Sequence, residues 1–180
     1  TCYCTHRAID CALDLVAAHP VKPEEIRDVT VGISDYFATV LRNHRPDTGL
    51  AAKFSIEFAM ASAIVAKHVG LRELTDEFVR QDGIQSLMGR VTTMTTATYD
   101  PDLPGAAPAD SVRIMLVSGE TLDGAPVARA TGHASRPLTE AQIYEKFADC
   151  LDAGRSEIAA ETLFARLNGM AGIEARALVR

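Results

Sequence analysis

The sequence predicts an α+β fold, with helices packed on one face of a roughly four-stranded, mainly antiparallel sheet. Its elements follow the order helix, strand, helices, three successive strands and two helices, which lacks the regular alternation of a doubly wound parallel sheet. The chain has 180 residues, of which 47% are hydrophobic, so it can bury one substantial core. No repeat or low-complexity tract divides it, and residues 1–180 are therefore predicted to form a single domain.

The N-terminal part predicts a helix followed by a strand. Thr5 is expected to cap the helix, because Ile9, Leu13 and Val16 follow it at helical spacing. Apolar and polar residues then alternate over residues 29–34, which predicts a half-buried strand.

The middle of the chain predicts a long loop and three helices. Residues 34–52 show no periodicity, and a connection of that length is typical of a loop that serves a functional site. Ser55 is expected to cap a helix that is apolar nearly all round and hence mostly buried. Thr75 and Asp82 are expected to cap two shorter helices.

The C-terminal part predicts three strands and two helices. β-Branched residues dominate the segment 91–98, and the segment 111–119 alternates between apolar and polar residues, so both are expected to be strands. A turn at Asp123 and Gly124 would return the chain as a fourth strand over residues 127–131. Thr139 with Gln142 forms a capping box for the next helix, and Ser156 is expected to cap the last.

Composition excludes several function classes. The 18 basic and 24 acidic residues give a net charge of −6, which would repel a nucleic acid backbone. No apolar run is long enough to span a membrane, and the N-terminus has no secretory signal. The 4 cysteines are too few for a secreted disulfide framework. A cytoplasmic chain with reduced thiols, and with neither nucleic acid nor membrane as partner, is therefore expected.

The candidates for chemistry lie at two starts of helices. His6 would occupy the first turn of its helix, where the helix dipole favours a neutral imidazole and attracts anions. Lys53 precedes the buried helix, where an ammonium could meet a carboxylate. The alternatives are a solvent-exposed polar residue for His6 and an exposed loop lysine for Lys53.

Metals and nucleotide cofactors are not indicated. Cys2, Cys4 and His6 are similar to part of a zinc site, but structural zinc needs four ligands and no second cluster follows. A zinc-dependent module therefore stays an alternative, and the expected metal is none. No glycine-rich phosphate loop is present, so no nucleotide cofactor is expected.

Several strings of the sequence together resemble one known family. They cover nearly the whole chain and read CYCTHRAID, TGLAAKFSIEFAMASAI, LTDEFV, LMGRV and RPLTEAQIYEKF. Together with the turn at Asp123, they resemble the C-terminal portion of the MmgE/PrpD family. That family includes 2-methylcitrate dehydratase, cis-aconitate decarboxylase and iminodisuccinate epimerase, which act on small polycarboxylates without an organic cofactor.

The resemblance implies a lyase or isomerase and a set of site residues. It implies that His6 exchanges a proton or binds a carboxylate, and that Lys53, Cys2 and Phe58 bind the substrate. Whether Cys2 or His6 is the residue nearer the substrate stays open. Phe58 lies where the decarboxylases place a tyrosine, and a phenyl ring cannot donate the hydrogen bond of a phenol. This difference argues against decarboxylation.

The resemblance also implies a partner domain. The family has a large helical N-terminal domain, and its smaller α+β domain, of a chorismate mutase-like topology, covers the substrate in a cleft between the two. The present sequence contains no such helical segment, so the chain alone is expected to be inactive. Its docking surface would then favour a homodimer. The alternative function is a noncatalytic binding or assembly module that retains the fold.

Overall fold

A computed structural model of the protein describes residues 1–170. The chain divides into two compact units, residues 1–136 and the segment that begins at Pro137. The first unit holds all the described strands, which are β1 (Ile26–Ser34), β2 (Val91–Thr96), β3 (Ser111–Leu116) and β4 (Thr121–Asp123). Its helices are α1 (His6–Ala18), α2 (Asp35–Val40), α3 (Gly49–Ala52), α4 (Ile56–Val65), α5 (Asp76–Val79) and α6 (Asp82–Met88).

The sheet confirms the predicted α+β class, with four strands in the order β2-β1-β3-β4. It is mixed rather than purely antiparallel, because β1 pairs with β2 in parallel while β3 is antiparallel to both of its neighbours, β1 and β4. The parallel pair follows from the connection between β1 and β2, which contains the helices α2 to α6 and so carries the chain back to the same end of the sheet.

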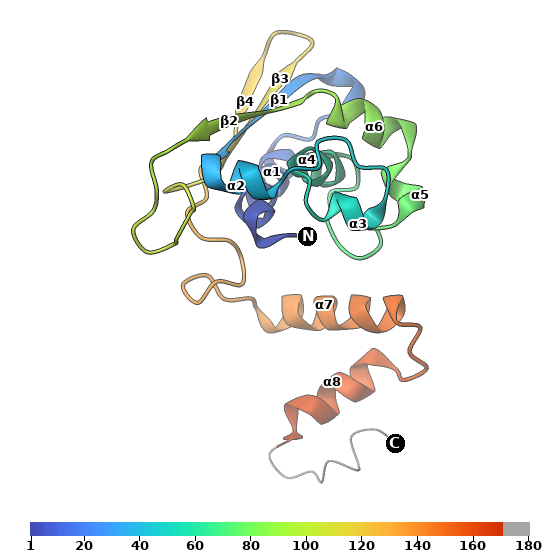
Figure 1. Ribbon diagram of the computed structural model, residues 1–180. Coiled ribbons are helices and arrows are strands. Elements are labelled where there is room, and N and C mark those ends of the chain that lie inside the picture. The colour runs from blue at the N-terminus through green and yellow to red at the C-terminus, as the bar shows by residue number, and fades with distance from the viewer. Residues whose placement is uncertain (171–180) are drawn as a thin grey trace. The chain divides into compact units, whose positions relative to one another are not determined.

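One face of the sheet carries the core of this unit. Val29, Val31 and Ile33 alternate along β1 and are at most 1% exposed. Figure 1 shows α1 and α4 side by side beneath the sheet, and both helices contact its strands. Nine of the ten residues of α4 are buried, as its nearly continuous apolar sequence predicts.

The predicted helix caps are confirmed at some positions and wrong at others. Ser55 and Thr75 accept hydrogen bonds from the first turns of α4 and α5, as expected. Asp82 instead lies inside the first turn of α6, after Gln81. The last helix, α8 (Ala160–Asn168), begins after Ala159, so Ser156 does not cap it.

The segment 34–52, predicted as a loop, contains two short helices. The hydroxyl of Ser34 accepts a hydrogen bond from the amide of Phe37 and so caps α2, and Thr48 caps α3 in the same way. Helices of four and six residues are too short to show a period of 3.6 residues, which is why periodicity missed them.

The predicted position of the hairpin turn is wrong. The chain turns at Gly119, which has a φ of +91° that glycine adopts without strain, and not at Asp123 and Gly124. The fourth strand is therefore β4, while residues 127–131 contribute only an isolated bridge between Val127 and Asp110.

The second unit, described to Met170, consists of two amphipathic helices. The predicted capping box of Thr139 and Gln142 is confirmed at the start of α7 (Glu140–Ala153). Tyr144 and Phe147 of α7 pack against Phe164 of α8, with ring centroids 5.1 Å and 5.4 Å apart. No residue of either helix is buried. Residues 171–180, which the predicted domain includes, lie outside the described residues.

Across residues 1–170, no helix combines the length and the apolar character that a crossing of the bilayer requires.

Candidate functional site

The N-terminal segment reaches α1 through an extra turn that sequence reasoning missed. Residues Tyr3–Thr5 form a 3-10 turn, so the first turn of α1 does not start directly after an extended chain. Thr5 was expected to cap α1, but its hydroxyl donates a hydrogen bond of 2.7 Å to the carbonyl oxygen of Cys2. This bond and the burial of Thr5 hold the segment folded back just before His6.

His6 is the first residue of α1 and is partly buried. Its imidazole lies against Tyr3, with ring centroids 5.4 Å apart and a tilt of 60° between the planes. The next residue, Arg7, is 1% exposed and anchored in the interior. The backbone of His6 is therefore held between a folded turn and a buried side chain, and its position at the helix start is well defined.

One backbone hydrogen bond brings the two predicted parts of the site together. The amide of Cys2 donates to the carbonyl oxygen of Lys53 at 2.8 Å. Lys53 ends α3, and its exposed side chain has no hydrogen-bond or ion-pair partner within residues 1–170. The segment that carries His6 and the turn that carries Lys53 are thus neighbours, although 47 positions separate the two residues in the sequence.

The turn at Lys53 is fixed from its other side by Asn43. The side-chain amide of Asn43 donates a hydrogen bond to the carbonyl oxygen of Ala51 at 2.8 Å. The backbone amide of Asn43 donates to the carbonyl oxygen of Phe54 at 3.2 Å. The loop at residues 41–48 therefore runs beside the turn at Lys53. Because both acceptors are backbone carbonyl oxygens, no pattern of side chains in the sequence predicts these contacts.

A buried acid lies just after this turn and was not predicted. Glu57, in the first turn of α4, is 6% exposed and accepts a hydrogen bond of 3.1 Å from the hydroxyl of Ser55. Its other oxygen lies 2.8 Å from Nδ1 of His44, whose ring is mostly exposed. A glutamate in the first turn of a helix is also favoured by the helix dipole, so this acid is stabilised locally.

Phe58 does not reach the surface on which the other candidates lie. It is 0% exposed, and its ring packs edge-on against Phe78 with centroids 6.3 Å apart. In this structure Phe58 acts as a core residue of α4.

The two N-terminal thiols, of Cys2 and Cys4, are close to each other. Burial and a hydrogen bond with Cys2 raise the pKa of Cys4 to about 12, so the Cys4 thiol stays protonated at neutral pH. Within residues 1–170, no three histidine, cysteine, aspartate or glutamate side chains form a group that could hold a metal ion.

A buried ion pair anchors α1 behind the site. Arg7 contacts Asp110 through Nε at 3.2 Å and Nη2 at 2.5 Å, and its Nη1 donates to the carbonyl oxygens of Ala107 and Ala128 at 2.7 Å and 3.3 Å. Both charged side chains are at most 1% exposed. Burial raises the pKa of Asp110 to about 6 against the opposing effect of Arg7.

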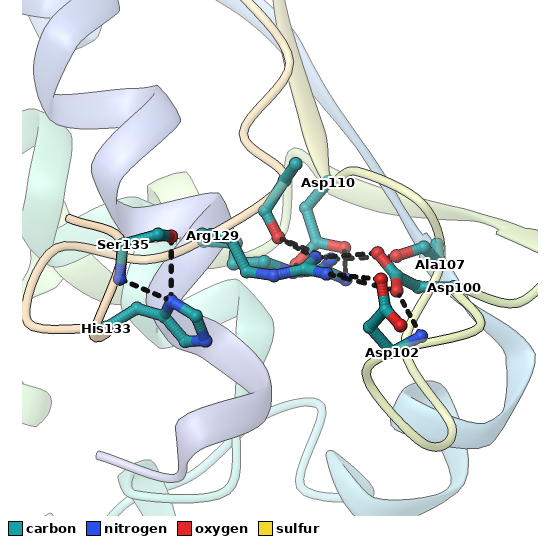
Figure 2. A network of polar contacts seen from close by, with 9 residues as sticks. Asp100, Asp102, Ala107, Asp110, Arg129, His133 and Ser135 are labelled. Atoms are coloured by element: carbon teal, nitrogen blue, oxygen red, sulfur yellow. Dashed lines mark hydrogen bonds and ion pairs between the residues drawn. The ribbon is translucent and has the colours of Figure 1, made fainter.

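A second network ties together the two loops that flank this pair, as Figure 2 shows. Arg129 contacts Asp100 at 2.6 Å and Asp102 at 3.9 Å, and this arginine holds the pKa of Asp100 near 2. His133 and Ser135 contact each other at 2.9 Å in the same region. Arg129 is paired with the acidic side chains of Asp100 and Asp102. We therefore interpret this network as a structural link between the two loops and not as a ligand site.

A larger cavity lies away from these residues. It measures about 640 Å³ and is lined by His19, Val21, Glu24 and residues of β3 and β4, at the C-terminal end of α1. Since α1 has 13 residues, a length of about 20 Å separates this cavity from His6. It contains none of the predicted site residues, and its acidic lining does not suit an anionic ligand.

The fold and this arrangement define a small α+β domain that carries a histidine at a helix start and an exposed lysine on neighbouring segments. The model of the MmgE/PrpD C-terminal domain matches residues 1–166, and the chain therefore belongs to the MmgE/PrpD family. A comparison with curated proteins found no match. Membership as a C-terminal domain implies an N-terminal partner domain.

Proposed function

We propose that this chain is the substrate-capping C-terminal domain of a cofactor-independent lyase or isomerase that acts on small polycarboxylates. Its partner would be the helical N-terminal domain of the family. The term complete enzyme is used below for this chain together with that domain. The observation that carries the proposal is the hydrogen bond from the amide of Cys2 to the carbonyl oxygen of Lys53. Because of this bond, the segment that carries His6 lies next to the turn that carries Lys53.

The proposed chemistry is proton transfer at a carbon next to a carboxylate. The imidazole of His6 would take up or deliver the proton, and a positioned histidine suits this task because it titrates near neutral pH. The ammonium of Lys53 would bind the adjacent carboxylate and stabilise the negative charge that develops on it. Cys2 would line the site beside Lys53, with its backbone holding the two segments together.

A deuterium-exchange screen tests this function. The complete enzyme is incubated in heavy water with a panel of dicarboxylates and tricarboxylates, and proton NMR follows each carbon-bound proton. We expect exchange or turnover at a carbon next to a carboxylate for at least one compound. The chain alone is the control and is expected to leave every signal unchanged. Absence of exchange and turnover across the whole panel would favour the noncatalytic binding module.

Replacing Lys53 with methionine in the complete enzyme is expected to raise KM with little change in kcat. A hydrogen bond to a charged group contributes about 1.5–3 kcal/mol, so the rise in KM should be about 10- to 100-fold. Steady-state kinetics on the substrate found in the screen measures it. Lys67→Met is the matched control, since Lys67 is an exposed lysine beyond the other end of α4. An unchanged KM in Lys53→Met would remove Lys53 from the site.

A further inference from the structure

A second cavity adjoins the turn that carries Lys53. It measures about 290 Å³ and is lined by Thr39, Val40, Arg42, Asn43 and Phe54. A volume of this size suits one arm of a small molecule and is too small for a nucleotide or a drug-sized ligand. Phe54 directly follows Lys53 in the sequence, and both residues are exposed.

Arg42 is the charged residue of this lining, and nothing in the described chain neutralises it. Its guanidinium has no hydrogen-bond or ion-pair partner within residues 1–170. Some other exposed arginines do have one, as Arg113 contacts Asp123 at 2.6 Å. Acidic residues outnumber basic ones by 24 to 18 in the sequence, so partners for an arginine are not scarce. An unpaired guanidinium that lines a cavity is therefore suited to an anion from outside the chain.

The cavity and the lysine are held in one rigid arrangement by Asn43. This residue lines the cavity and also donates hydrogen bonds to the carbonyl oxygens of Ala51 and Phe54, on both sides of Lys53. The Asn43 contacts fix the spacing between the backbone positions of Arg42 and Lys53. A ligand with two separated negative charges can bridge two cations that are held in this way.

We infer that the cavity at Arg42 is a second carboxylate subsite, distinct from the one at Lys53, which holds a further carboxylate arm of a polycarboxylate. A guanidinium binds a carboxylate through two parallel hydrogen bonds and so fixes its orientation, whereas an ammonium acts as a point charge. Arg42 would thus select substrates by the position of their second carboxylate. This inference rests on the proposed function for the nature of the ligand.

Direct binding of citrate and tricarballylate to the complete enzyme, measured by isothermal titration calorimetry, tests the subsite without requiring turnover. Arg42→Gln is expected to weaken binding of at least one of them about 10- to 100-fold, because it removes a charge-assisted pair of hydrogen bonds. Arg42→Lys keeps the charge but loses the paired geometry, so its affinity should lie between those of Arg42→Gln and the unaltered enzyme.

Arg45→Gln is the matched control. Arg45 is an exposed arginine of the same loop that also has no partner in residues 1–170 and does not line the cavity, so its replacement should change affinity less than about threefold. The subsite is overturned if Arg42→Gln changes the affinity by less than about threefold, or if Arg45→Gln weakens binding as much as Arg42→Gln does. It is also overturned if the unaltered enzyme binds neither citrate nor tricarballylate. Failure of the proposed function is seen separately, as absence of proton exchange in an enzyme whose binding still depends on Arg42.

Discussion

Replacing Asp110 with asparagine is expected to lower the free energy of unfolding by about 3–5 kcal/mol. The substitution keeps the shape of the side chain but leaves the guanidinium of Arg7 buried without its counter-charge, and Arg7 is only 1% exposed. Urea unfolding at pH 7.5 measures the loss, because Asp110, with a pKa of about 6, is ionised there in the folded protein. A domain with a typical stability of about 5–15 kcal/mol would lose a large part of it.

An exposed ion pair provides the control for Asp110. Asp123→Asn removes the partner of Arg113 on the surface, where both side chains are more than half exposed, and should cost less than about 1 kcal/mol. The double variant Arg7→Met with Asp110→Leu should be less destabilised than the sum of its single substitutions, since it leaves neither charge unpaired. Equal losses in Asp110→Asn and Asp123→Asn would show that the buried pair is not the anchor of α1.

Replacing His6 with alanine in the complete enzyme is expected to lower kcat by about 10²- to 10⁴-fold, the usual contribution of a general acid or base. The residue is held at the start of α1 by the folded turn before it and by the buried Arg7 after it, so the imidazole would already be positioned for proton transfer. The pH profile of kcat/KM should also lose the limb that belongs to His6.

His19→Ala separates chemistry from stability in this experiment. His19 is exposed at the opposite end of the same helix, so its replacement is expected to leave kcat unchanged. Thermal unfolding should show both variants folded at the assay temperature. A kcat of the His6 variant within about threefold of the unaltered enzyme would remove His6 from the proposed mechanism.

The sequence identified the segments of the candidate site better than their contacts. His6 and Lys53 stood out because each lies next to the start of a helix, and the structure brings their segments together. Asn43, which holds the turn at Lys53, and the buried Glu57 were missed. An asparagine in a loop and a glutamate in a first helical turn are common in any sequence, and only their partners make them informative.

Local patterns determined much of the fold by themselves. The caps at Ser55, Thr75 and Thr139 and the buried character of α4 depend on residues within one or two turns, so the sequence alone predicts them. Tertiary structure decided the parallel pairing of β1 with β2, the pairing of Arg7 with Asp110 across 103 positions, and the contact of Cys2 with Lys53. These contacts gain their free energy only when distant segments are buried together, and no periodicity within one segment encodes which partner it will meet.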